Sequence, residues 1–155
     1  MRIKLIYSVL LVLLTACTTL RTAPDVVREI SRKVESKEFT VAVNYAIPMR
    51  MRPVYLTSEY NLMIKNDSTF AYLPYFGVAY SAPYNPSEGG IKFAEPMTDY
   101  KITKHQKADG WDICYKVRTK LTVYNFSLNI FNNGSSSITV NSYEKDMINF
   151  SGEIK

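Results

Sequence analysis

The stretch WDICYKVRTKLTVYNFSLNI, residues 111–130, decides the fold class. Its apolar residues fall at every second position, first over 111–117 and again over 124–130, and polar or charged residues stand between them. Successive side chains of a β-strand point to opposite faces of the sheet, so a period of two predicts strands with one apolar and one polar face. A helix would need a period near 3.6, which is absent here.

The same alternation recurs along most of the chain. It is clear over 39–47 and 60–64, and shorter β-rich runs lie at 54–57, 69–73, 91–95, 99–105, 136–143 and 146–154. Asp109-Gly110 and Asn133-Gly134 are typical of hairpin turns between such runs. We therefore predict an all-β fold with one N-terminal helix. The nine or ten short strands would form an antiparallel meander, arranged as a barrel or a sandwich.

The predicted helix lies in PDVVREISRKVESKEF, residues 24–39. Val26, Ile30 and Val34 recur every four residues and so share one face of a helix, and Pro24 suits its first turn. The basic residues on the rest of its surface would also suit a membrane-surface helix. Because the apolar stripe is narrow and lacks Trp, Phe and Leu, we expect the helix to pack against the β-domain.

The N-terminus reads as an export signal. Arg2 and Lys4 precede an apolar run from Leu5 to Leu14, which is shorter than the about 20 residues that a membrane-spanning helix needs. The run ends in Leu-Thr-Ala-Cys at residues 14–17, which resembles the lipobox of bacterial lipoproteins. In that class the cysteine carries the acyl chains, palmitate among them. We predict a lipoprotein signal peptide at 1–16, a tether at 17–23 from lipidated Cys17, and a single β-rich domain at 24–155.

The anchor predicts a place in the cell envelope. Several acyl chains on one cysteine hold a protein stably at a membrane, so the expected partner of the N-terminus is a membrane. Thr18 follows the cysteine in place of aspartate, which by resemblance to lipoprotein sorting rules favours the outer membrane. No acidic run follows either, so we expect the domain to face the periplasm.

Cysteine count and charge exclude several classes of protein. Once Cys17 is lipidated, Cys114 is the remaining cysteine, so the mature chain has no internal disulfide and depends on its core for stability. The formal net charge of +5 falls when Arg2 and Lys4 are removed with the signal, and no long basic run follows. We therefore expect no nucleic-acid partner.

Candidate catalytic residues are few. His105 is the only histidine, and its lysine-rich surroundings before the Asp109-Gly110 turn predict a solvated hairpin tip. Cys114 falls on the polar face of its strand and has no second cysteine for redox work. Neither residue has the neighbours that a nucleophile and its base require, so we predict no enzyme activity and no catalytic residue.

Metal and cofactor sites are not indicated. One histidine and one mature cysteine cannot build a zinc site of nitrogen and sulfur ligands, and Asp109 and Asp112 lack the spacing of a calcium loop. No glycine-rich phosphate loop is present, so we expect neither metal nor cofactor. Glu59, Glu88 and Glu95 could supply a pair of carboxylates for a hydrolase, although nothing in their spacing favours it.

One short motif suggests a modification. Asp67-Ser68-Thr69 resembles an acceptor for O-glycosylation in some bacterial envelopes. It lies in a predicted turn, where Ser68 would be accessible.

Residues 70–90, FAYLPYFGVAYSAPYNPSEGG, concentrate aromatic rings where proline and glycine interrupt regular structure. Two interpretations stay open. The rings of Phe76, Tyr80 and Tyr84 could fill the open end of the β-structure as a lid, because each buried ring covers much apolar surface. Alternatively, the segment 72–90 forms a rim for binding, since tyrosine combines a rigid apolar ring with a polar tip. The candidate binding residues are Tyr72, Tyr75, Phe76, Tyr80 and Tyr84.

The stretches LPYFGVAYSAPYNPSEGGIKF (73–93) and LNIFNNGSSSITV (128–140) resemble the DUF4251 family of small bacterial envelope proteins. The resemblance covers about residues 30–155. It implies a β-rich envelope domain, and it brings no catalytic or binding residues that could be transferred.

These observations predict a non-catalytic envelope lipoprotein that acts as a binding or accessory module. Its ligand would be a small apolar molecule, a glycan or another envelope protein. A structural component of an outer-membrane assembly is the alternative, and a carboxylate-dependent hydrolase is the third class.

Overall fold

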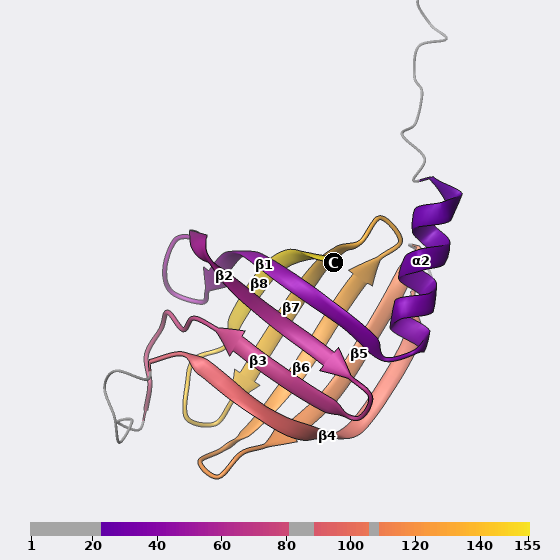
Figure 1. Ribbon diagram of the computed structural model, residues 1–155. Helices are drawn as coiled ribbons and strands as arrows, with labels where there is room; N and C mark the ends of the chain where they lie inside the picture. The colour runs from indigo at the N-terminus through magenta and orange to yellow at the C-terminus, as the bar shows by residue number, and fades with distance from the viewer. Residues whose placement is uncertain (1–22, 81–88, 106–108) are drawn as a thin grey trace, which may run out of the picture.

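The computed structural model describes residues 23–80, 89–105 and 109–155 and contains one helix and eight strands in that part of the chain (Figure 1). The elements are α2 (Pro24–Glu35), β1 (Glu38–Pro48), β2 (Val54–Lys65), β3 (Ser68–Leu73), β4 (Ile91–Lys104), β5 (Gly110–Arg118), β6 (Val123–Phe131), β7 (Ser135–Ser142) and β8 (Ile148–Ile154).

The strands form a closed antiparallel barrel. Each strand pairs with the next along the chain, and β8 pairs with β1 to close the sheet. The predicted all-β meander with one N-terminal helix is confirmed. Of the two predicted arrangements, barrel and sandwich, the structure is a barrel. Closure leaves no open edge, so the main-chain groups along the strands are used within the ladders.

The strand count of eight is lower than predicted because two predicted breaks are irregularities within continuous strands. In β2, the ladder with β1 passes from the pair Val43–Tyr60 to the pair Tyr45–Tyr55, so several extra residues of β2 bulge there. In β4, the ladder with β5 shifts between Thr98 and Lys101, next to Asp99 with a positive φ of 56°. The runs 54–57 and 60–64 therefore belong to one strand, as do 91–95 and 99–105.

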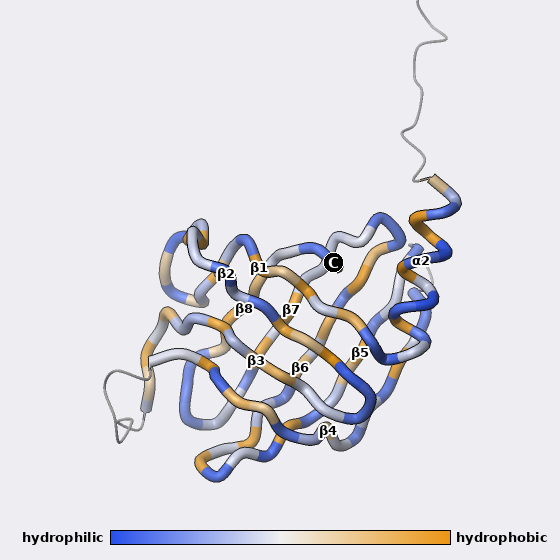
Figure 2. The backbone as a smooth tube through the Cα atoms, viewed as in Figure 1, coloured by the Kyte–Doolittle hydropathy of each residue, from blue (hydrophilic) through white to orange (hydrophobic). Residues whose placement is uncertain are grey.

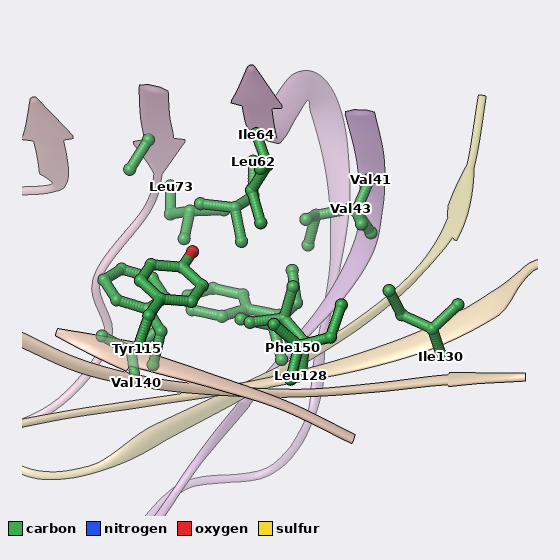
Figure 3. Close-up of a cluster of buried hydrophobic side chains, with 14 of the residues drawn as sticks. Val41, Val43, Leu62, Ile64, Leu73, Tyr115, Leu128, Ile130, Val140 and Phe150 are labelled. Atoms are coloured by element: carbon green, nitrogen blue, oxygen red, sulfur yellow. The ribbon is translucent and has the colours of Figure 1, made fainter. Parts of the chain in front are cut away.

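Apolar side chains fill the barrel interior, as the alternation predicted. Figure 3 shows side chains from β1, β2, β3, β5, β6, β7 and β8 pointing toward one another in the core, among them Leu62, Tyr115 and Phe150. The rings of Tyr115 and Phe126 stack with centroids 5.1 Å apart. An eight-stranded barrel is just wide enough for its side chains to fill it, and buried apolar side chains from all eight strands occupy this one.

The helix packs against the barrel, as expected. Ile30 and Val34 are buried, and the position where a Cβ of Gly134 would stand is 3.5 Å from the Ile30 side chain. The turn at Asn133-Gly134 lies between β6 and β7 as predicted, and Gly134 has a φ of 86°. The helix ends at Glu35, earlier than the predicted segment, because β1 begins at Glu38.

The barrel has two distinct ends. We call the end that carries α2 and the turns at 66–67 and 132–134 the helix end. The loop end carries the connections 49–53, 74–80, 119–122 and 143–147, and it lies on the opposite side of the barrel in Figure 1. Because the strands alternate in direction, successive connections fall at opposite ends.

Candidate functional site at the loop end

The predicted binding residues that the structure describes lie in different environments. Tyr75 and Phe76 are partly buried against the core, whereas Tyr80 is 63% exposed at the loop end. Tyr72 points outward from β3 on the barrel wall, and Tyr84 lies outside the described residues. The segment therefore combines both interpretations, with some rings covering the core and others facing solvent.

The segment 74–80 is fastened to the connection between β7 and β8. The Tyr80 amide donates to the Glu144 carbonyl at 2.7 Å, and the Asp146 amide donates to the Val78 carbonyl at 3.0 Å. An isolated antiparallel bridge pairs Ala79 with Lys145. These contacts hold two connections together outside the barrel ladders and fix the position of Tyr80.

Asp146 is the centre of this arrangement, with a side chain only 5% exposed. The Tyr80 hydroxyl donates to Asp146 Oδ1 at 2.5 Å. Arg50 Nε stands 3.3 Å from Asp146 Oδ2, an ion-pair contact that lacks hydrogen-bond geometry. The Tyr75 hydroxyl lies 2.9 Å from the Val78 carbonyl oxygen and 3.1 Å from that of Asp146, and it donates its single proton between them. Three connections thus meet at one buried carboxylate.

The surroundings shift the acidities of these groups. Burial, followed by the charge of Asp146, raises the pKa of Tyr75 to about 12. The hydrogen bond to Asp146 is the main cause that raises the pKa of Tyr80. Burial lowers the pKa of Lys145, whose ammonium lies 5.0 Å from the centroid of the Tyr75 ring. Both phenols keep their protons at neutral pH and serve as hydrogen-bond donors.

Exposed apolar side chains gather at this end. Among the described residues, every large apolar side chain that is more than half exposed belongs to the loop-end connections or to the adjoining start of β2. We call this set the loop-end surface: Met49, Met51, Tyr55, Tyr80, Leu121 and Tyr143. In Figure 2, apolar stretches interrupt polar ones in the connections β1–β2 and β5–β6. Exposed apolar groups concentrated at one place mark interaction sites.

The loop-end surface is bordered mainly by cations. The basic residues of the loop-end connections and adjoining strand ends are Arg50, Arg52, Arg118, Lys120 and Lys145. The acidic residues of the described connections are Glu144 and the buried Asp146. The predicted binding residues did not include Met49, Met51, Tyr55, Leu121 or Tyr143, because the prediction considered aromatic rings in one segment only. The available signal was apolar residues beside basic ones in predicted connections, as in MRMR at 49–52.

Comparison with protein families shows to which family the chain belongs. The model described as Domain of unknown function (DUF4251) matches residues 23–154. The chain belongs to the DUF4251 family. The crystal structure of a DUF4251 family protein from Bacteroides eggerthii DSM 20697 is similar to this DUF4251 domain in fold, with a TM-score of 0.63 and 13% sequence identity, over 83% of this chain and 86% of that one. No curated protein matches the chain.

The wall of the DUF4251 domain carries a second group of tyrosines. The rings of Tyr60 and Tyr72 stack with centroids 5.3 Å apart, and the Lys92 ammonium lies 5.1 Å from the Tyr72 centroid. Tyr45, also on the wall, meets Tyr55 of the loop-end surface edge to face at 5.1 Å. Tyr72 is therefore engaged by its own neighbours and does not join the loop-end surface.

The side chain of His105 is more buried than the sequence predicts. Its side chain is only 12% exposed, its Nε2 lies 2.8 Å from Asp112 Oδ1, and its ring packs edge to face against Phe131. The expected solvated hairpin tip is wrong for this residue, because Phe131 and the start of β5 cover the ring. His105 lies at the helix end, far from the loop-end surface.

The other candidate groups are dispersed. Cys114 is exposed on the barrel wall as predicted, with its thiol 3.7 Å from the Ser127 hydroxyl. Glu59 is exposed on β2 and Glu95 half-buried on β4, whereas Glu88 lies outside the described residues. Within the described ranges no group of three or more metal-ligating side chains comes together, and no helix is long and apolar enough to cross a membrane.

Ser68 is the first residue of β3 and is half-buried. It follows the turn at 66–67 and does not lie within it, so it is less accessible than the sequence suggested.

Proposed function

We propose that this DUF4251 protein is a non-catalytic binding module of the bacterial envelope, held to the membrane by lipidated Cys17, and that the loop-end surface contacts its partner. The observation that carries the proposal is the concentration of the most exposed apolar side chains at one end of the barrel. A rim fixed in advance by the Asp146 contacts loses little entropy on binding.

A surface partner fits better than a small molecule inside the barrel. Core side chains occupy the interior beneath Tyr75 and Phe76. The exposed residues stand on several connections, as an envelope protein or another extended surface would require. Met49 and Met51 are flexible apolar groups that adapt to a partner's shape.

The proposed anchor is compatible with this orientation. Only residues 18–23 separate Cys17 from the start of α2, and such a segment reaches roughly 20 Å at full extension. Because α2 leads into the barrel at the helix end, an anchored molecule would present its loop end away from the membrane, toward the periplasm.

Methionine footprinting tests the proposal. Peroxide oxidation of Met49 and Met51 should be slower in intact envelopes than in the purified protein, because a bound partner shields both thioethers. Met63, which is half-buried on β2 near the helix end, serves as an internal reference in the same digests. Equal oxidation rates of Met49 and Met51 in the two preparations would show that the loop-end surface is unoccupied in the envelope and would refute the proposed function.

A further inference from the structure

A second surface lies on the barrel wall, away from the loop-end surface. An open groove with a volume of about 590 Å³ runs over β4, β5, β6 and β7. Its outward-facing polar lining consists of Asp99, Lys101, Cys114, Lys116, Asn125, Ser127, Thr139 and Asn141, and Met147 lines it as well. Its size falls within the range of ligand sites.

Strand register arranges this lining in two rows. In the first, Lys101 opposes Cys114, which opposes Ser127, which opposes Thr139 on β7. Directly opposed residues point to the same face, so this row crosses four strands as a line of side chains about 4.8 Å apart.

The second row lies alongside it. Lys116 opposes Asn125, which opposes Asn141, and Asp99 forms an ion pair with Lys116 at 2.8 Å. Short side chains in the middle of both rows leave the floor low, and the longer Lys101 and Lys116 rise beside it. The groove therefore follows from side-chain length, next to the irregularity of β4 between Thr98 and Lys101.

The chemistry of the lining restricts the ligand. Asn125 and Asn141 each offer a donor and an acceptor, and the Ser127 and Thr139 hydroxyls do the same. The strands beneath belong to a closed barrel, so a peptide has no edge to extend as an added strand. A ligand must be held through side chains, which favours a polyhydroxylated chain over a peptide.

The spacing of the strands and the charge of the groove restrict the class of ligand further. The spacing between strands is close to the length of one pyranose unit in a 1,4-linked chain. Asp99 neutralises Lys116, and Lys101 adds a further cation, so the groove has a positive balance that suits carboxylates. The asparagine amides match the acetamido groups of amino sugars.

We infer that the groove over β4–β7 binds an extended glycan of N-acetylated amino sugars that carry carboxylates. The glycan lies across the strands, with an acetamido group between Asn125 and Asn141 and a carboxylate at Lys101. This site depends on the proposed function only for the location of the protein in the envelope, where such glycans occur. The loop-end surface is a separate site, and either can be wrong without the other.

The test uses the chain without residues 1–17, which retains every described residue. The probes are glycan strands of peptidoglycan released by an amidase, which removes the peptides and leaves the lactyl carboxylates free, chitohexaose, which has acetamido groups without carboxylates, and dextran, which has neither. Binding is followed by calorimetry and by the alkylation rate of Cys114. This residue lines the groove and is the only cysteine left once residues 1–17 are removed. We expect affinity to fall in the order peptidoglycan strands, chitohexaose, dextran, and the first probe to slow alkylation.

Variants locate the binding. Asn125→Ala and Asn141→Ala should each weaken binding of the peptidoglycan strands about fivefold through one lost hydrogen bond, and Ser127→Tyr should abolish it by filling the floor. Asn61→Ala on the opposite wall is the matched control and should bind like the unmodified chain. Unchanged melting temperatures show that the variants fold. No binding of the peptidoglycan strands, equal binding of dextran, or equal loss in Asn61→Ala would overturn the inference.

Discussion

At the scale of single residues, Asp146 explains why the loop end has a defined shape. Its carboxylate joins Tyr80 and Arg50, and its main chain joins Val78 and Tyr75. A buried carboxylate is costly unless its neighbours compensate its charge. These neighbours come from two other connections, so the compensation also fixes the connections relative to one another.

Tyr75 makes this arrangement sensitive to alkaline pH. Its ordinary pKa of 10.0 rises to about 12 in the fold, so the folded state holds the phenol proton more tightly than the unfolded state. The stability that Tyr75 contributes is complete below pH 10 and is lost as pH rises toward 12. Tyr75→Phe should melt lower than the unmodified protein at neutral pH, and the gap should narrow between pH 10 and 12.

Thermal unfolding of both proteins across this pH range measures the gap. Because other tyrosines titrate in the same range, the comparison with Tyr75→Phe isolates the contribution of one residue. A gap that stays constant from pH 8 to 12 would contradict the account of Tyr75.

His105 shows what residue-level reading of the sequence lacks. Its local neighbours are lysines and a turn, which indicate solvent. The residues that bury it, Phe131 and Asp112, come from β6 and β5 and meet it only through strand pairing. The cluster at Asp146 could not be predicted for the same reason, since Asp146 is more than sixty positions away from Tyr75 and Tyr80.

At the scale of elements, strand identity was predictable and strand continuity was not. Alternation located β1, β5, β6 and β7 well, because one face of each is buried and the other polar. The bulges in β2 and β4 interrupt that alternation without ending the strand, so each appeared as two strands. Barrel closure depends on the pairing of β1 with β8, the first and last strands, which no local pattern encodes.

The seam between β1 and β8 depends on Gly152. A Cβ at this position would stand 2.0 Å from the Ala42 carbonyl oxygen of β1, so a side chain forces the two backbones apart. Gly152→Ala should lower the free energy of unfolding by about 1–3 kcal/mol, the usual cost of overpacking. Chemical denaturation measures this change.

Gly89→Ala is the matched control, because nothing lies within 4 Å of the position of its added Cβ. It should leave the free energy of unfolding nearly unchanged. Equal stability of the Gly152→Ala and Gly89→Ala proteins would show that the β1–β8 seam tolerates a side chain and is looser than described.

At the scale of the whole molecule, the closed barrel separates two ends with different surfaces. The helix end receives the proposed anchor, and the loop end bears the exposed apolar and basic residues. The class of fold could be predicted from the sequence, because alternation is a local pattern. The location in the envelope, which rests on the N-terminal signal, stays a prediction. It did not predict the loop-end surface, because four connections form it together only after the strands have alternated in direction.

The anchor is tested at the same scale. In cells supplied with labelled palmitate, the protein should incorporate label and sediment with membranes, and Cys17→Ala should do neither, because the Cys17 sulfur is the atom to which the lipid is attached. Cys114→Ala is the control and should be labelled normally. Undiminished labelling of Cys17→Ala would contradict the proposed anchor.

The most direct test of the loop-end surface is photo-cross-linking in intact cells. A photoreactive residue is placed at Leu121 or Tyr143, the two most exposed apolar positions, and at Ile102 near the helix end as the matched exposed control. We predict a discrete cross-linked species at Leu121 and Tyr143 that is absent at Ile102. The same pattern at all three positions, or none at Leu121 and Tyr143, would contradict the central claim that the loop end is where this protein meets its partner.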